Sequence, residues 1–199
     1  MATDRSQVRS TTGTDKIRIT GLTKLFRTGH TSVTALAEVN LTVPDGQFLC
    51  VVGPSGCGKT TMLRIMGGLE TPTSGEVAVS RRDKGKPINS MIFQEHAIFP
   101  WLTVRDNVSY GLRMRGISRS EARDSADEYV RKVGLARFAS AFPHQLSGGM
   151  KQRVSIARAF ANDPEILLMD EPFASLDEQT KILLQEELLR VWEETRKTV

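Results

Sequence analysis

The sequence has no long hydrophobic run, and it has few cysteines, histidines and aromatic residues. Apolar stretches such as residues 48–52 and 166–169 span five and four residues, far fewer than the roughly 20 that cross a bilayer. We therefore expect no transmembrane segment. Residues 1–15 are rich in serine and threonine and lack an apolar stretch. This composition predicts a disordered tail rather than a signal peptide, and an intracellular protein.

Cysteine usage and charge balance agree with that location. Cys50 and Cys57 match neither a metal-binding pattern nor a disulfide framework, which suits a reducing compartment. The 27 Lys and Arg and 23 Asp and Glu are interspersed along the chain and leave a net charge of +4. This balance is compatible with polyphosphate ligands or an anionic membrane surface, and we predict no nucleic-acid partner.

The order of the expected elements is typical of an α/β domain. Strands are expected at residues 16–20, 41–43, 47–52, 75–79, 90–93 and 166–169. Helices are expected at 60–67 and 178–196, and residues 95–158 have a helical pattern. Apolar positions predicted to face a core are Val104, Val108 and Leu112 in that helical stretch, and Ile182, Leu183, Leu189 and Trp192 in the last helix.

A glycine-rich loop follows the strand expected at 47–52 and fits the pattern G-x-x-x-x-G-K-[ST]. Its glycines allow successive backbone N–H groups to surround phosphate oxygens, and the next helix presents its positive end. We expect Lys59 to reach the β- and γ-phosphates of ATP and the Thr60 hydroxyl to ligate Mg²⁺. The alternative is a chance glycine-rich turn, and we expect Cys57 to be a small filler rather than a nucleophile. The predicted nucleotide-binding residues are Gly53, Pro54, Ser55, Gly56, Cys57, Gly58, Lys59, Thr60 and Thr61.

Two carboxylates, Asp170 and Glu171, follow the strand expected at 166–169. In α/β folds, ligands bind at the carboxyl ends of strands. One acid can serve a metal shell while the other orients or deprotonates an attacking water, a division that phosphoryl transfer to water requires. Taken alone, an acidic pair of this kind is more typical of a solvated helix cap.

A second anion-binding helix start is predicted at Ser147, Gly148 and Gly149, where a Ser-Gly-Gly turn opens a helix. Physical chemistry alone also allows a simple N-capped helix. Residues 146–150 look like the signature of the ATP-binding cassette family, and from this point the sequence resembles that family. The resemblance extends over residues 16–199, and the motifs occur in the family's order.

The resemblance implies an α/β P-loop NTPase core with an N-terminal antiparallel β subdomain. It assigns residues 16–94 and 159–199 to the core and residues 95–158 to an inserted helical subdomain. Phe26 resembles the aromatic that stacks on adenine, and Gln94 the glutamine that reaches Mg²⁺ and the attacking water. Without the resemblance, Phe26 is more typical of a core aromatic and Gln94 of a surface amide. By the same resemblance, Asp170 supports Mg²⁺ and Glu171 is the general base.

The resemblance also implies partners. Family members dimerise head to tail, so each ATP lies between one subunit's P-loop and the other's signature turn, and the loop at 174–177 crosses the interface. Residues 93–108 resemble the importer branch, especially its nitrate, sulfonate and taurine group. By this resemblance, a groove for transmembrane permease subunits includes Phe99, Trp101 and Leu102. An equally supported alternative is that these residues anchor the core. A solute-binding protein is an indirect partner, and the cytoplasmic face of the cell membrane is the expected location.

The chain departs from the family near its C-terminal end, where members continue into a strand that ends in a γ-phosphate-sensing histidine. His30, His96 and His144 all precede the acidic pair, so the implied core sheet is incomplete. We expect a gap or a substitute strand between residues 47–52 and 166–169. Two alternatives to an importer ATPase stay open: a nucleotide-binding module with little turnover, and a non-transport relative acting in DNA repair or translation.

Overall fold

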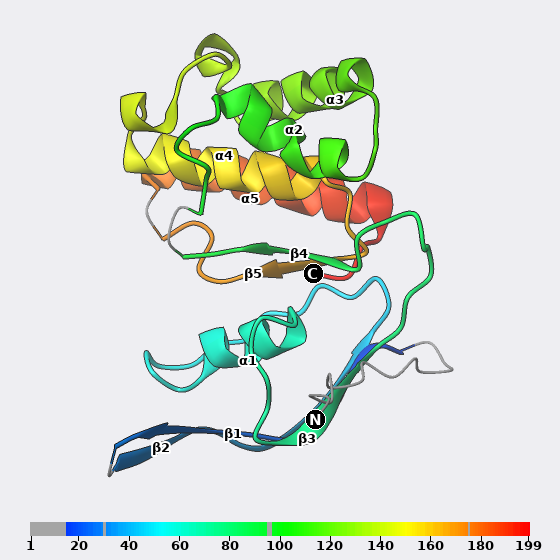
Figure 1. The fold of residues 1–199 in the computed structure, drawn as a ribbon, viewed down its shortest axis with the longest axis vertical. Helices are drawn as coiled ribbons and strands as arrows, with labels where there is room; N and C mark the ends of the chain where they lie inside the picture. The colour runs from blue at the N-terminus through cyan, green and yellow to red at the C-terminus, as the bar shows by residue number, and fades with distance from the viewer. Residues whose placement is uncertain (1–14, 30, 95–96, 175) are drawn as a thin grey trace, which may run out of the picture. The chain divides into compact units, whose positions relative to one another are not determined.

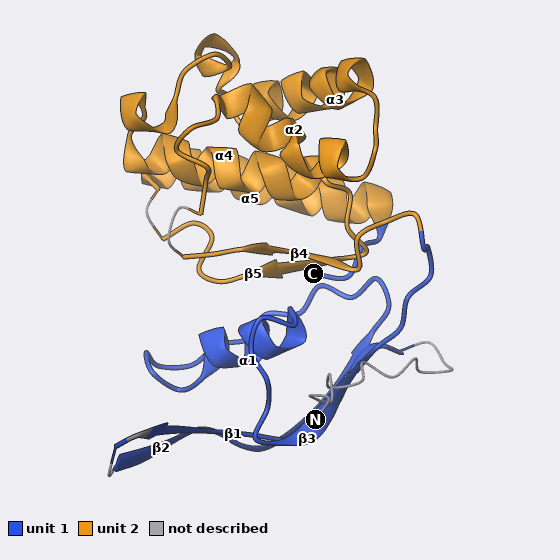
Figure 2. Ribbon diagram, viewed as in Figure 1, with its two compact units in different colours: residues 1–84, 196–199 blue, residues 85–195 orange. Residues whose placement is uncertain are grey.

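The structure, a computed structural model, describes residues 15–29, 31–94, 97–174 and 176–199. The chain divides into two compact units (Figure 2). Unit 1 comprises residues 1–84 and 196–199, and unit 2 comprises residues 85–195. Residues 1–14 of the tail expected at 1–15, together with His30, His96 and Ser175, lie outside the described residues. Asp15 was wrongly included in that tail, because it begins the first strand.

Unit 1 is built on a three-stranded antiparallel sheet in the order β2-β1-β3 (Figure 1). The strands are β1 (Asp15–Thr28), β2 (Thr31–Pro44) and β3 (Ser74–Val79). Alternation along β1 buries Ile17 and Ile19. A register shift at Gly21, whose φ is 58°, then brings Leu22 to a buried position and lets β1 run past the predicted end at residue 20. The expected N-terminal antiparallel β subdomain is confirmed.

The segment before the glycine-rich loop differs from its prediction. No strand forms at residues 47–52, and the end of this segment is exposed. Backbone hydrogen bonds join its start to Val199, from Val199 N to Gln47 O (2.9 Å) and from Leu49 N to Val199 O (2.8 Å). The prediction was wrong because apolar composition favours burial, whereas a strand needs hydrogen-bonded partners along its length. The expected gap beside residues 166–169 stays a prediction, since those residues belong to unit 2.

Unit 2 combines helices with a two-stranded parallel sheet (Figure 1). Its strands pair in register from Asn89 opposite Ile166 to Ile92 opposite Met169, so their carboxyl ends meet at one edge. The elements are β4 (Asn89–Ile92), α2 (Val104–Met114), α3 (Arg119–Lys132), the 3-10 turns Ala136–Phe138 and Pro143–Gln145, α4 (Gly148–Ala161), β5 (Ile166–Met169) and α5 (Glu178–Thr195).

The apolar spacing predicted for the helical stretch is confirmed where α2 packs on α3. Val104, Val108 and Leu112 repeat every four residues on α2, and all three are buried. Their α3 counterparts include Ala122 and Ala126, which are fully buried. Small alanine side chains allow two helices to approach closely, so this pair forms a tight hairpin.

Helix α5 buries a different face from the one predicted. Leu184 and Leu188 are buried, whereas Leu183 and Leu189 are 60% and 47% exposed; Ile182 is also exposed and Trp192 is half-buried. Adjacent leucines offer two faces of one helix about 100° apart, so periodicity alone did not decide between them. None of the described helices combines the length and the apolar composition needed to cross a membrane.

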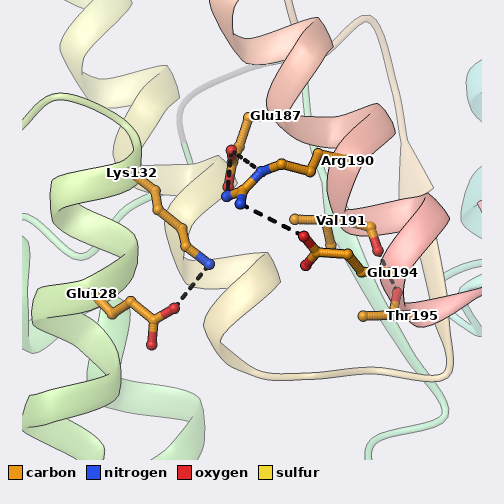
Figure 3. A network of polar contacts seen from close by, with 7 residues as sticks. All are labelled: Glu128, Lys132, Glu187, Arg190, Val191, Glu194 and Thr195. Atoms are coloured by element: carbon orange, nitrogen blue, oxygen red, sulfur yellow. Dashed lines mark hydrogen bonds and ion pairs between the residues drawn. The ribbon is translucent and has the colours of Figure 1, made fainter.

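Ion pairs lie along the exposed sides of α3 and α5 (Figure 3). Arg190 binds Glu187 at 2.8 Å and reaches Glu194 at 3.6 Å on α5, and Lys132 binds Glu128 at 2.8 Å on α3. These are pairs spaced by three or four residues, which lie on one side of a helix. They stabilise the two helices modestly, because such pairs are solvated.

Candidate functional site

The glycine-rich loop leads into α1 (Lys59–Met66), and its lysine side chain lies back across the loop. Lys59 Nζ donates to the carbonyl oxygens of Gly53 (2.8 Å) and Pro54 (3.0 Å). The N-cap of α1 is Gly58, which provides no side-chain cap, and the first turn of α1 contains no acidic residue. A helix start with uncapped N–H groups and no competing carboxylate attracts anions. The loop thus combines an ammonium group with a helix start that has no side-chain cap, two features that favour binding of a phosphate.

Two glycines of this loop lie close to neighbouring atoms. Gly58 has a φ of 97°, and a Cβ there would lie 2.3 Å from the carbonyl oxygen of Ala35 on β2. At Gly53 a Cβ would lie 2.8 Å from Cys57 Sγ. No side chain fits at Gly58, so the loop backbone there stays close to β2, whereas at Gly53 the close atom is a side-chain sulfur. Cys57 is exposed, and its predicted role as a small filler stays a prediction.

Phe26 lies on the sheet beside the same loop. In the register of β1 and β2 it pairs with Val33, two residues from the Ala35 carbonyl that Gly58 approaches. The Phe26 side chain is 40% exposed, and Lys24 Nζ lies 4.9 Å from its ring centroid. An exposed aromatic ring near a phosphate-binding loop is available to stack on a nucleobase.

The carboxyl ends of β4 and β5 bring Gln94 and Glu171 together. Each residue follows its strand by two positions, and extending the register from Ile92 opposite Met169 places them side by side. Gln94 Nε2 donates to Glu171 Oε2 at 3.3 Å, and both residues are exposed. An exposed carboxylate oriented by an amide can accept a proton from a nearby water.

The two neighbouring acids have different surroundings. Asp170 is only 4% exposed, and its backbone N donates to Ile92 O (2.9 Å), which continues the ladder between β4 and β5. Glu171 has a φ of 46°, in the left-handed region that residues with side chains seldom adopt. Such a conformation costs about 1 kcal/mol or more and is concentrated at functional sites. The change in backbone direction separates a buried carboxylate from an exposed one.

The signature turn opens α4 as an exposed helix start. Ser147 is the N-cap, and its Oγ accepts a hydrogen bond from Met150 N (3.3 Å). Ser147 and Gly148 are exposed and Gly149 is half-buried, while the first turn contains no acidic residue. This turn therefore presents the positive end of a helix to solvent, which leaves it accessible to a ligand held by another molecule.

The loop at residues 174–177, apart from Ser175, ends in a cap of α5. Asp177 Oδ1 accepts a hydrogen bond from Thr180 N (2.9 Å). This backbone donor holds the pKa of the Asp177 carboxyl below its usual value. Asp177 thus caps the helix, and the role predicted for this loop in a dimer interface stays a prediction.

Sequence reasoning missed Asn107, a fully buried amide that organises the loop before α2. Asn107 Nδ2 donates to the carbonyl oxygens of Phe99 (3.1 Å), Leu102 (3.0 Å) and Thr103 (3.0 Å), and its Oδ1 accepts from Phe99 N (2.8 Å). The signal was present, since Asn107 interrupts the apolar face of α2. The loop that it fixes carries Trp101, which is 69% exposed and therefore is not a core anchor.

The predicted metal ligands are divided between the two units. Thr60 belongs to unit 1, and Gln94 and Asp170 belong to unit 2. Within the described ranges, no three His, Cys, Asp or Glu side chains form a cluster that could hold a metal ion. Mg²⁺ typically takes one or two protein ligands and completes its shell with water and substrate phosphates. Within unit 2, the Gln94 amide and the buried Asp170 carboxylate each offer an oxygen of the kind that Mg²⁺ binds.

Comparisons with known proteins agree on one family. The sequence profile of the ABC transporter family matches residues 36–174. An uncharacterized ABC transporter ATP-binding protein of Methanocaldococcus jannaschii is 49% identical over 186 residues, 92% of this chain and 70% of that protein. The nitrate import ATP-binding protein NrtD of Synechocystis sp. is 47% identical (89% of this chain, 67% of that protein), and the taurine import ATP-binding protein TauB of Pelagibacter ubique is 44% identical (89% and 68%).

A solved structure has the same fold. The ATP-binding cassette MJ0796, in a dimeric post-hydrolysis state bound to ADP and Pi, superposes with a TM-score of 0.84 at 37% identity, over 92% of this chain and 85% of that chain. The expected P-loop fold is thus confirmed. The chain spans about two thirds of the length of the curated relatives it matches, from 63% to 70%.

Proposed function

The chain belongs to the ABC transporter family, and on that premise we propose that it binds ATP with Mg²⁺ and hydrolyses it to energise a membrane importer. The observation that carries the proposal is the pair formed by Gln94 and Glu171. Binding of ATP alone needs neither residue, whereas hydrolysis needs a group that orients water and a group that accepts its proton. The pair supplies both.

In this proposal unit 1 holds the nucleotide. The uncapped N–H groups at the start of α1 bind phosphate oxygens, and Lys59 leaves the carbonyl oxygens of Gly53 and Pro54 to bind the β- and γ-phosphates. The Thr60 hydroxyl would ligate Mg²⁺. Phe26 stacks on adenine through its exposed ring.

In unit 2, Asp170 and Gln94 would hold Mg²⁺, which when bound neutralises charge on the transferring phosphoryl group. Glu171 accepts the proton of the attacking water, and Gln94 orients both that water and the carboxylate. The strained backbone of Glu171 supports this role, because it turns the base away from the buried Asp170.

We extend the proposal to partners through the family resemblance. A second ATPase subunit would present Ser147, Gly148 and Gly149 to the γ-phosphate held by the first, in a head-to-tail dimer; the dimeric state of MJ0796 supports this. Exposed Trp101 would contact a transmembrane permease, placing the chain at the cytoplasmic face of the membrane. The names of the nitrate and taurine import relatives support a small anionic or zwitterionic solute, delivered by a solute-binding protein.

Transport by a reconstituted complex tests the proposal. The chain is produced together with a candidate multi-span permease, reconstituted in liposomes, and assayed for ATP-driven uptake of nitrate and of taurine. We expect uptake of a solute with the parent chain and none with Glu171→Gln. ATP turnover without any associated membrane protein would favour a non-transport relative, and an assembled complex without turnover would contradict the proposal.

A further inference from the structure

A buried glutamine of α4, which sequence reasoning also missed, touches both backbone segments that carry the Gln94–Glu171 pair. The Gln152 side chain is 1% exposed. Its Nε2 donates to the carbonyl oxygen of Pro172 at 2.8 Å and to that of Phe93 at 3.5 Å. Phe93 directly precedes Gln94, and Pro172 directly follows Glu171. One amide group therefore bridges the two peptides that flank the pair.

The bridge lies where the strand ladder stops. The paired register of β4 and β5 ends at Ile92 opposite Met169, and the bond from Asp170 N to Ile92 O is the next step. Beyond it, the carbonyl groups of Phe93 and Pro172 meet the Gln152 amide, whose two N–H groups match two acceptors. Gln152 thus continues the connection between the strands by one more position, up to the pair itself.

The hydrogen bonds of the Gln152 amide give this side chain a role that packing alone would not require. The neighbours of Gln152 on its face of α4, Ser155, Ile156 and Ala159, are buried as well. Burying an amide costs free energy unless its hydrogen bonds are made, and an apolar side chain of the same shape would avoid that cost. A buried donor that meets two carbonyl groups beside the catalytic pair therefore fits a positioning role.

We infer that Gln152 is a positioning residue: it ties the Gln94–Glu171 pair to the signature helix, so that the helix sets the geometry of the pair. Ser147, at the start of the same helix, is exposed five positions earlier. Contact at the signature turn thereby influences the catalytic pair of the same subunit. The catalytic part of this inference rests on the proposed function, whereas the structural link between Gln152 and Gln94 does not.

The structural link is tested by NMR of the Gln94 side-chain amide, assigned by its loss in Gln94→Ala. Gln152→Met keeps the length of the side chain and removes both donors. We expect the Gln94 amide signal to shift or broaden in Gln152→Met and to stay unchanged in Gln185→Met, a matched change at an exposed position of α5. An unchanged Gln94 signal in a folded Gln152→Met protein would overturn the inference.

Kinetics test the functional consequence. For Gln152→Met we expect kcat of ATP hydrolysis to fall about tenfold, the effect of one lost buried hydrogen bond, with KM and ATP affinity unchanged. A loss of affinity with unchanged kcat would contradict the positioning role. If the parent chain itself shows no turnover, the proposed function fails while the NMR result still decides the structural link.

Gln152→Glu provides a second variant, because only a protonated carboxyl can donate to the two carbonyl oxygens. Burial raises the pKa of a carboxyl group, so the fraction of the variant side chain that is protonated and able to donate increases as pH falls. We expect the turnover of Gln152→Glu, as a fraction of the parent's turnover at the same pH, to rise as the solution is made more acidic. A fraction that is independent of pH would count against the inference.

Discussion

Gln94 and Glu171 are separated by 77 positions in the sequence and are joined by a hydrogen bond of 3.3 Å between Nε2 and Oε2. The contact results from two short parallel strands that end in register, each followed after two positions by one member of the pair. The proposed proton acceptor and its orienting amide therefore come from distant segments, and the spacing between β4 and β5 controls the geometry of both.

Replacing Lys59 by alanine should weaken the binding of ATP with Mg²⁺. The side chain provides an ammonium group inside the loop, and hydrogen bonds to charged groups contribute about 1.5–3 kcal/mol, roughly a tenfold to hundredfold change in affinity. Isothermal titration calorimetry measures the effect. Lys181→Ala, on α5 in the other unit, is the control and should bind as the parent does. Equal affinities for all three proteins would remove Lys59 from the binding site.

Gly58→Ala should destabilise the protein much more than Gly116→Ala does. Both glycines have positive φ, 97° and 81°, but a Cβ at Gly58 would lie 2.3 Å from Ala35 O, whereas at Gly116 it would meet nothing within 4 Å. We expect the free energy of unfolding to fall by about 1 kcal/mol in Gly116→Ala because of the strained backbone. In Gly58→Ala it should fall by at least about 2 kcal/mol more because of the clash. Thermal melting compares the two variants, and similar losses would show that the loop moves away from β2 without cost.

Asn107→Ala should loosen the loop that carries Trp101. The change removes the side-chain partner of Phe99 N and of Leu102 O, whereas Phe99 O and Thr103 O keep backbone donors; a buried polar group left without a partner costs about 1–3 kcal/mol. Asn40→Ala, at an exposed position of β2, is the control, and it should have little effect on the hydrogen exchange of residues 99–103. Hydrogen exchange of residues 99–103 should rise in Asn107→Ala alone; unchanged protection there would contradict the role of Asn107.

The ion pair between Glu128 and Lys132 should make a small contribution to stability that disappears in acid. The hydrogen bond from Lys132 holds the pKa of Glu128 below its usual value. Folding therefore favours the ionised carboxylate, so the contribution is complete above the unfolded pKa and is lost as pH falls through the folded one. Since the Glu128 side chain is 51% exposed, we expect less than about 1 kcal/mol at neutral pH.

Glu128→Gln tests this contribution by thermal melting over a pH series. The variant should melt slightly below the parent at neutral pH, and the two curves should converge as the pH falls below the folded pKa of Glu128. A difference that grows toward acid would reverse the sign of the argument.

The sequence predicted those parts of the molecule whose signals are local. The glycine-rich loop, the helix that follows it, the Ser147 cap and the strand before Asp170 all depend on residues within a few positions of each other. The wrong predictions depend on neighbours distant in the chain. Residues 47–52 have the composition of a buried strand without its ladder, and α5 presents two leucine faces between which only tertiary packing decides.

Buried amides mark a second limit of sequence reasoning. Asn107 and Gln152 are almost fully buried, and their partners are backbone carbonyl groups that no side-chain pattern reveals. Gln94 was found through family resemblance alone, although its bond to Glu171 follows from the register of two parallel strands. Once β4 and β5 are paired, that contact is predictable.

The most direct measurement of the central claim is phosphate release from ATP by the parent chain and by Glu171→Gln at saturating ATP with Mg²⁺. The amide of the variant can still hold a water molecule but cannot accept its proton, so turnover should fall by about a hundredfold or more while the affinity for ATP stays the same. Phosphate release by the parent with its loss in the variant is the expected result. Equal rates for the two proteins would contradict the assignment of Glu171 as the base and, with it, the proposed mechanism.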